Sequence, residues 1–195
     1  MFFRVVENLL PKQVFNRLLA LVEGEDIDWH WARSTNYVNR NATDSNFMLG
    51  KLLFHPFKNE TPSNAGHYID KPYTELFCLI TDYQLTIHPF SSVVNMKLNL
   101  YPNQGKNVKH VRHADVMNEK KEIDDRFMTS LFNFHTCNGS TVIELGNKIE
   151  EVKSKANQLI MFDNTWHYGI TPSDTPRRIV LNINVLKSSS IKPLS

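Results

Sequence analysis

The stretch Ser92–Tyr101, SVVNMKLNLY, marks a change in the character of the chain. From Asn95 onward polar and apolar residues alternate, so that Met96, Leu98 and Leu100 share one face. A period of two is typical of a β-strand, because successive side chains point to opposite faces of the sheet. The stretch therefore predicts a strand with one apolar face and one polar face.

Four later runs have the same strand-like character and are separated by turn clusters. They are Phe127–Phe134, Ser140–Leu145, Asn157–Phe162 and Arg177–Val185. Two amphipathic helices are predicted before them, at Pro11–Gly24 and at Tyr73–Gln84, the second with Asp70 as a candidate cap. Helices followed by a run of strands predict an α+β, mainly β fold, with the helices packed on one face of an antiparallel sandwich or barrel.

Composition limits the class of protein. The chain has 195 residues, 41% of them hydrophobic and 22% charged, which predicts one globular domain. A net charge of +2 gives no reason to expect nucleic-acid or membrane binding. Arg4 and Glu7 interrupt the apolar start, which is therefore read as neither a signal peptide nor a membrane span. We expect a cytoplasmic protein with Cys78 and Cys137 reduced, and we leave its oligomeric state open.

The sequence HVRHAD, His110–Asp115, is the first candidate for chemistry. On a strand, His113 and Asp115 point to the same side and His110 points to the other. His167, after the apolar run that ends at Phe162, could supply a third ligand. Two imidazoles and one carboxylate on one side of a metal suit non-haem Fe(II), but a solvated strand end explains the pair alone equally well.

The order of these motifs is more specific than any one of them. Tyr101–Asp115, then Asn157–Gly169, then Pro176–Val185 resembles the 2-oxoglutarate and Fe(II)-dependent oxygenases, and within them the prolyl hydroxylase branch. The resemblance covers roughly Val93–Val185. It implies a double-stranded β-helix, or jelly roll, with the amino-terminal helices on its major sheet. We expect one domain, 1–195.

Within that domain the resemblance suggests three parts. Residues 1–90 are expected to form a helical and irregular support region, residues 91–186 the jelly-roll catalytic core, and residues 187–195 a tail.

The resemblance also implies the site and its reaction. His113, Asp115 and His167 match the family's iron ligands, whereas His110 is expected at the surface or behind the site. The implied cofactors are Fe(II), 2-oxoglutarate and dioxygen, with ascorbate as a candidate addition. The implied reaction hydroxylates a C–H bond and decarboxylates 2-oxoglutarate to succinate.

A cation is needed for the far carboxylate of 2-oxoglutarate, and Arg177 and Arg178 are both candidates. A simple rule that apolar faces point inward favours Arg177, which shares a face with Ile179 and Leu181. In the fold implied by the resemblance, however, helices cover the outside of this sheet, so the polar face turns to the cavity. The family's arginine pattern also fits Arg178 better, and we therefore predict Arg178.

Two further residues complete the implied cosubstrate site. Tyr101 matches a tyrosine that contacts 2-oxoglutarate in the prolyl hydroxylases, although a strand-closing tyrosine fits the pattern equally well. Asn133 stands where that branch has a second tyrosine, and an asparagine can donate to a carboxylate but reaches less far.

The substrate is the least constrained part of the prediction. The branch favours prolyl residues in a protein or peptide, and a free amino acid or other small molecule is the second class. The mixed-charge loop Val116–Phe127 and the polar segment Ser34–Phe47 are expected near the mouth of the barrel. Two other readings stay open: a non-redox, cupin-type metal-binding protein, and an interaction domain with a decayed site.

Overall fold

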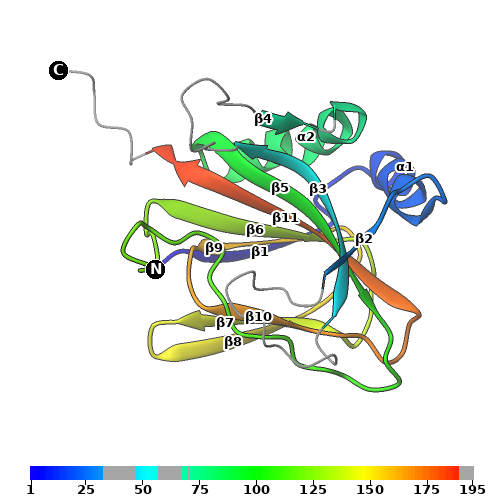
Figure 1. Cartoon of the computed structure of the whole chain (residues 1–195). Coiled ribbons are helices and arrows are strands. Elements are labelled where there is room, and N and C mark those ends of the chain that lie inside the picture. The colour runs from blue at the N-terminus through cyan, green and yellow to red at the C-terminus, as the bar shows by residue number, and fades with distance from the viewer. Residues whose placement is uncertain (33–46, 57–66, 70, 189–195) are drawn as a thin grey trace.

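A computed structural model describes residues 1–32, 47–56, 67–69 and 71–188 of the chain. The strands form two antiparallel sheets that face each other, with both helices on the far side of the larger one (Figure 1). The major sheet has eight strands: β1 (Phe3–Glu7), β9 (Gln158–Asp163), β6 (Phe127–Asn133), β11 (Arg177–Lys187), β5 (Phe90–Pro102), β3 (Met48–Pro56) and β2 (His30–Ala32) in this order, with β4 (His67–Ile69) paired to β3. The minor sheet contains β10 (His167–Ile170), β7 (Ser140–Leu145) and β8 (Lys148–Lys153).

Strands β5 and β11 lie side by side in the major sheet, and their register fixes what faces the space between the sheets. Tyr101 pairs with Arg178, and Lys97 pairs with Asn182. These four residues lie on one face because they are separated by even numbers along each strand. The polar face predicted from the sequence therefore points inward.

The segment before Asp115 adds a fourth, strand-like segment to the minor sheet. Lys109 bridges Ile170 and His113 bridges His167, both in antiparallel fashion. From β5 onward the chain passes from one layer to the other at each step, except that β7 and β8 follow each other in the minor sheet. With the bridged segment, the minor layer has four members that face β5, β6, β9 and β11 of the major layer, which is the arrangement of a double-stranded β-helix. The amino-terminal strands extend the major layer beyond that core.

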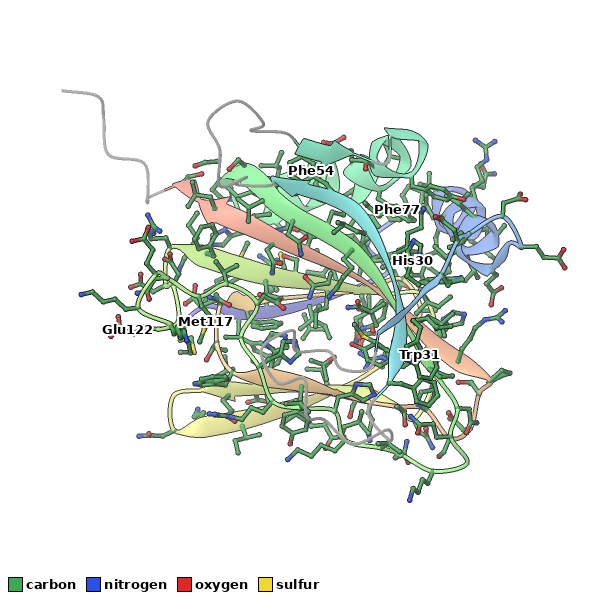
Figure 2. All side chains as sticks on the ribbon, viewed as in Figure 1. His30, Trp31, Phe54, Phe77, Met117 and Glu122 are labelled. Atoms are coloured by element: carbon green, nitrogen blue, oxygen red, sulfur yellow. The ribbon has the colours of Figure 1, made fainter. Side chains whose placement is uncertain are left out.

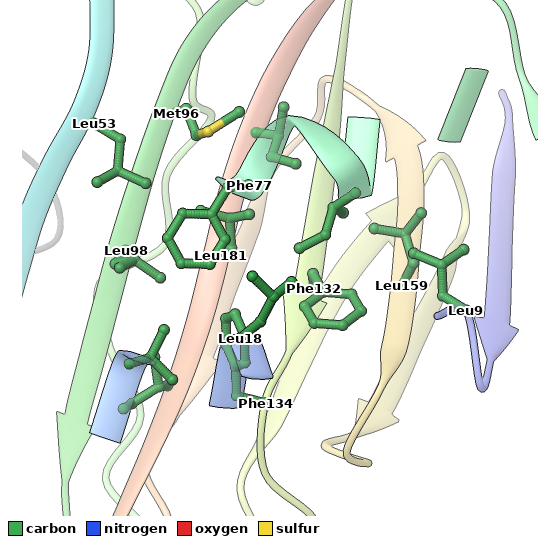
Figure 3. Close-up of a cluster of buried hydrophobic side chains, with 14 of the residues drawn as sticks. Leu9, Leu18, Leu53, Phe77, Met96, Leu98, Phe132, Phe134, Leu159 and Leu181 are labelled. Carbon is green, nitrogen blue, oxygen red and sulfur yellow. The ribbon is translucent and has the colours of Figure 1, made fainter. Parts of the chain in front are cut away.

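The apolar face of β5 and β11 packs against the helices in the main hydrophobic core. Helix α1 (Lys12–Glu23) buries Phe15, Leu18 and Val22, and helix α2 (Lys71–Ile87) buries Phe77. The ring of Phe15 lies edge-on to Phe132 of β6 at 6.2 Å. Figure 3 shows Leu18 and Phe77 among the leucines of the sheet. The helices thus cover the outer face and leave the inner face to the cavity.

The first ninety residues contain more sheet than the sequence indicated. Strands β1, β2, β3 and β4 lie there, in addition to the two helices. Each of the unpredicted strands is short or contains polar interruptions, so periodicity alone does not separate it from a loop. The predicted cap Asp70, most of the segment 34–47 and the tail beyond 188 lie outside the described residues.

In the described part of the chain no helix is long and apolar enough to cross a membrane. Cys78 and Cys137 are not joined to each other by a disulfide.

Candidate metal centre

A cavity opens between the two sheets, and its walls come from both. The major sheet contributes Lys97, Asn99, Tyr101 and Arg178, and the minor sheet contributes His167. His113, from the bridging segment beside β10, also lines it. The side chains that reach the cavity are mainly polar, which is unusual for the space between two packed sheets.

His113, Asp115 and His167 converge at one wall of this cavity. Their candidate ligand atoms all lie within 4.8 Å of one another. The Nε2 atom of His113 is 3.7 Å from Oδ1 of Asp115, and that of His167 is 3.7 Å from Oδ2. The backbones of the two histidines pair directly, with N–H to O=C distances of 2.9 and 2.8 Å. The hairpin-like pairing of distant segments therefore brings the three side chains together.

The orientation of both imidazole rings is set by backbone carbonyls. Nδ1 of His113 lies 3.0 Å from the carbonyl oxygen of Val111, and Nδ1 of His167 lies 2.9 Å from that of Thr165. A carbonyl can only accept, so each Nδ1 carries a proton, and in a neutral ring Nε2 is then the nitrogen with the lone pair that a metal can use. This is the arrangement in which a histidine is ready to bind a metal.

The carboxylate of Asp115 is held by the major sheet. Its Oδ2 accepts hydrogen bonds from Thr129 Oγ1 at 2.9 Å, from Asn182 Nδ2 at 3.2 Å and from Asn184 Nδ2 at 2.9 Å. Oδ1 accepts none from the described residues. One oxygen is thus fully used in positioning, and the other remains for a cation.

The electrostatics of the three groups suit a divalent metal. Burial, together with the charge interaction with His167, lowers the pKa of His113 to about 4. Burial raises the pKa of Asp115, but His167, His113 and the hydrogen bond from Asn184 outweigh burial and hold that pKa well below its usual value. At neutral pH His113 is therefore neutral and Asp115 is ionised, as metal binding requires.

Arg178 lies at the other end of the cavity and has no acidic partner. Its side chain is buried, with 1% exposure, and no carboxylate in the described residues lies within ion-pair distance. Nη1 donates to the carbonyl of Ser140 at 2.7 Å, and Nη2 donates to Thr141 Oγ1 at 2.7 Å and to Asn133 Oδ1 at 3.1 Å. Nε has no hydrogen-bond partner. A buried, uncompensated guanidinium is costly by several kcal/mol, which points to an anion in the cavity.

Asn133 lies behind Arg178 and does not line the cavity wall. Its Nδ2 already donates to Gln158 Oε1 at 3.0 Å, and its Oδ1 accepts from Arg178. It therefore orients the guanidinium, and one N–H of its amide is used by Gln158; its predicted contact with a cosubstrate stays a prediction. Tyr101 does line the cavity, and the Arg178 guanidinium lies 5.6 Å from the centre of its ring.

Arg177 lies on the outer side of the major sheet, whereas His110 lies in an irregular segment and is buried against a residue that lines the cavity. Arg177 points away from the cavity and lies 3.6 Å from Glu23 of α1. The centre of the buried His110 ring lies 4.9 Å from that of Tyr101, and neither ring nitrogen has a hydrogen-bond partner among the described residues. Burial lowers the pKa of His110 to about 4, with smaller contributions from His113 and Arg178.

The loop after Asp115 is more ordered than its charge pattern indicated. Met117 bridges Ile123, and Asn164 Nδ2 donates to the carbonyls of Val116 at 2.6 Å and of Asp124 at 3.1 Å. The loop lines an open groove of its own beside β6. In Figure 2, Met117 lies at the left edge of the molecule, far from Trp31.

Several residues that line the cavity or hold a key side chain were not given a role from the sequence: Thr129, Thr141, Asn182 and Asn184. The signal was present, since most of them continue the polar face of a strand whose other face is apolar. Gly139 was also missed. A side chain there would place Cβ 3.2 Å from Cδ of Arg178 and 2.9 Å from the carbonyl oxygen of Ile170.

Comparison with solved structures identifies the fold. The chain matches a prolyl-4-hydroxylase from Pseudomonas putida with a TM-score of 0.63 at 15% sequence identity, over 95% of this chain and 92% of that chain. It matches an oxidoreductase of the 2OG-Fe(II) oxygenase family from Burkholderia pseudomallei with a TM-score of 0.67 at 7% identity, over 98% and 88%. A third match, with a TM-score of 0.60 at 14% identity over 97% and 87%, is a prolyl hydroxylase from Trichoplax adhaerens in complex with a hypoxia inducible factor peptide fragment.

The chain therefore has the fold of the 2-oxoglutarate and Fe(II)-dependent oxygenases, and proteins of the prolyl hydroxylase type are among those it resembles. No protein-family model matches the sequence, and no curated protein does either.

Proposed function

We propose that this protein is an Fe(II)- and 2-oxoglutarate-dependent dioxygenase that hydroxylates a C–H bond. One observation carries the proposal: Arg178, buried and without an acidic partner, faces the same cavity as His113, Asp115 and His167. A divalent metal at one end and a dianionic acid anchored at the other would satisfy both features together.

The chain's residues have distinct tasks in this reaction. His113, Asp115 and His167 would hold Fe(II) through Nε2, Oδ1 and Nε2, since their other polar atoms are occupied. When bound, iron would activate dioxygen, which is the oxidant, and 2-oxoglutarate would supply two electrons as it is converted to succinate and carbon dioxide. Arg178 binds the far carboxylate of 2-oxoglutarate, and Asn133 and Thr141 keep the guanidinium in place.

Exclusion of water is the other task of the protein. The cavity lies between two sheets whose inner faces also bury Leu131, Ile143, Ile160, Phe162 and Val180. Exclusion of water from the cavity strengthens the charge interactions in it and keeps the oxidant from reacting with solvent.

The same geometry weighs against the two other classes of function. A non-redox metal-binding protein of cupin type needs no carboxylate anchor, so it leaves the buried charge of Arg178 unexplained. A decayed site is equally hard to reconcile with two imidazoles and a carboxylate that are all held by hydrogen bonds in a ligand-ready orientation.

For the substrate we propose a protein or peptide, with prolyl hydroxylation as the first activity to test. The support is the likeness to two prolyl hydroxylases, one of them in complex with a peptide. A free amino acid or other small molecule is the second class to test.

Anaerobic titration tests the proposal. Adding Fe(II) and then 2-oxoglutarate to the metal-free protein should produce a visible metal-to-ligand absorption band, and admitting oxygen should convert 2-oxoglutarate to succinate. Analogues of 2-oxoglutarate that lack the keto group, such as succinate, should give no band. Tight Fe(II) binding with neither the band nor succinate would favour the non-redox metal-binding class instead.

A further inference from the structure

Lys97 is a second cation in the cavity, and it too lacks a partner. Its side chain projects from β5, is half-buried, and makes no hydrogen bond or ion pair with any described residue. Other well-covered lysines of this protein are paired: Lys51 contacts Asp28, and Lys187 lies 2.9 Å from Asp163. Burial lowers the pKa of Lys97, while the charge of Asp115 opposes that shift. An anion in the cavity would relieve the cost of burying this ammonium.

The register of the sheet places Lys97 level with the candidate metal ligands. Lys97 pairs with Asn182, and Asn182 donates to Asp115. Tyr101 pairs with Arg178, four residues further along β5. At about 3.3 Å per residue, the backbones at these two levels are roughly 13 Å apart. The two cations therefore serve opposite ends of the cavity, and the anion that Arg178 binds does not have to be the anion that Lys97 binds.

A count of the formal charges in the cavity also indicates a second anion. Fe(II), Arg178 and Lys97 would bring four positive charges into the cavity, and Asp115 with the dianion of 2-oxoglutarate would bring three negative ones. One positive charge is then left uncompensated in a buried space, and a singly charged anion would neutralise it.

Two polar atoms beside Lys97 also await a partner. Oδ1 of Asn182 and Oδ1 of Asn99 are buried without a hydrogen-bond partner. The orientation of Asn182 is fixed, because its Nδ2 donates to the carboxylate of Asp115. A molecule that binds Lys97 would therefore meet hydrogen-bond acceptors next to the cation, and an N–H or O–H group would satisfy them.

We propose that Lys97 binds a carboxylate of the prime substrate, close to the carbon that is oxidised, and so makes this site selective for acids over their neutral analogues. The proposal rests on the proposed function and narrows its substrate class. The carboxylate can belong to a free amino acid or to an acidic group of a peptide, and matched substrate pairs distinguish these two sources.

The test compares each acid with its amide. One panel contains free amino acids, L-proline among them, and the corresponding amino acid amides. A second contains short proline-containing peptides with a free or an amidated carboxyl terminus, and with Glu or Gln beside the proline. Succinate formation above the substrate-free rate should favour the acid by about ten- to a hundredfold in kcat/KM in at least one panel, as expected for a charge-assisted bond.

Variants then assign that selectivity to Lys97. Lys97→Met should reduce the ratio of acid to amide to near one, and Lys97→Arg should restore most of it. Lys148→Met removes the same charge from the exposed strand β8 and should leave the ratio unchanged. A second readout does not need turnover: in protein loaded with Mn(II) and 2-oxoglutarate, NMR lines of the acid should broaden in the wild type and much less in Lys97→Met.

Three outcomes would overturn the inference. The wild type would prefer the neutral member of every active pair, or Lys97→Met would keep the selectivity, or Lys97→Met would raise the requirement for 2-oxoglutarate as much as Arg178→Lys does, which would make Lys97 a cosubstrate ligand. Failure of the proposed function looks different, because the wild type would then form neither the absorption band nor succinate. The difference in NMR line broadening between the acid and its amide would still decide the role of Lys97.

Discussion

Replacing Arg178 by lysine is the sharpest test of how 2-oxoglutarate is held. The guanidinium uses Nη1 and Nη2 to reach Ser140, Thr141 and Asn133, and keeps Nε unpartnered. A lysine ammonium carries one nitrogen on a different stem, so it cannot keep these bonds and also bind a carboxylate in bidentate fashion.

The expected loss follows from those contacts. A charge-assisted hydrogen bond contributes about 1.5–3 kcal/mol, which corresponds to roughly a ten- to hundredfold change in affinity. The 2-oxoglutarate concentration needed for half-maximal succinate formation should rise by that factor in Arg178→Lys. Titration of the absorption band under anaerobic conditions should show the same shift without turnover.

Arg177→Lys is the matched control. Its exposed contact with Glu23 contributes only about 0–1 kcal/mol and faces away from the cavity, so 2-oxoglutarate binding should stay near the wild-type value. If the two variants behaved alike, or if Arg177→Lys were the weaker binder, the anchor would be misassigned and the strand register argument would be wrong.

Two further predictions concern the metal end of the site. His167→Ala should abolish both the absorption band and succinate formation while the far-UV circular dichroism is kept. His110→Ala should keep the band, because His110 is not among the converging ligands. A band of normal intensity in His167→Ala would refute the ligand assignment. The metal-free protein should lose stability as the pH falls from about 6.5 towards 4. In the folded protein the pKa values of His110 and His113 are about 4, which is below their value in the unfolded chain. The unfolded chain therefore binds more protons in this pH range, and acid favours it. Each histidine can account for up to about 3 kcal/mol, so urea denaturation at pH 7 and pH 4.5 should differ clearly, and equal unfolding free energies would contradict the assignment of these two groups as neutral in the fold.

The pleat of β11 shows what the sequence could predict. Alternation along Arg177–Val185 separates a polar face from an apolar one, and knowing that helices cover the apolar face was enough to place Arg178 in the cavity and Arg177 outside. The same alternation in β5 gave Asn99 and Tyr101. Period-two patterns are informative here because both strands are long and lie in the middle of the sheet.

Other features depend on contacts between distant segments, which periodicity does not contain. The sequence did not indicate that Asn133 would hydrogen-bond both Gln158 on the neighbouring strand and the guanidinium of Arg178. The charged residues after Asp115 looked like a solvated loop, but Asn164, some forty residues away in sequence, fastens the loop to the barrel. The short strand β1 is defined by its pairing with β9 and not by its own composition.

The three converging side chains do not belong to one layer of the jelly roll. His113 and His167 are rungs of the minor sheet, whereas Asp115 is fastened by Thr129, Asn182 and Asn184 to the major one. A cation bound by these ligands would therefore connect the two layers of the sandwich. Because such a cation would bind only the folded arrangement of these ligands, metal loading should also stabilise the protein against unfolding.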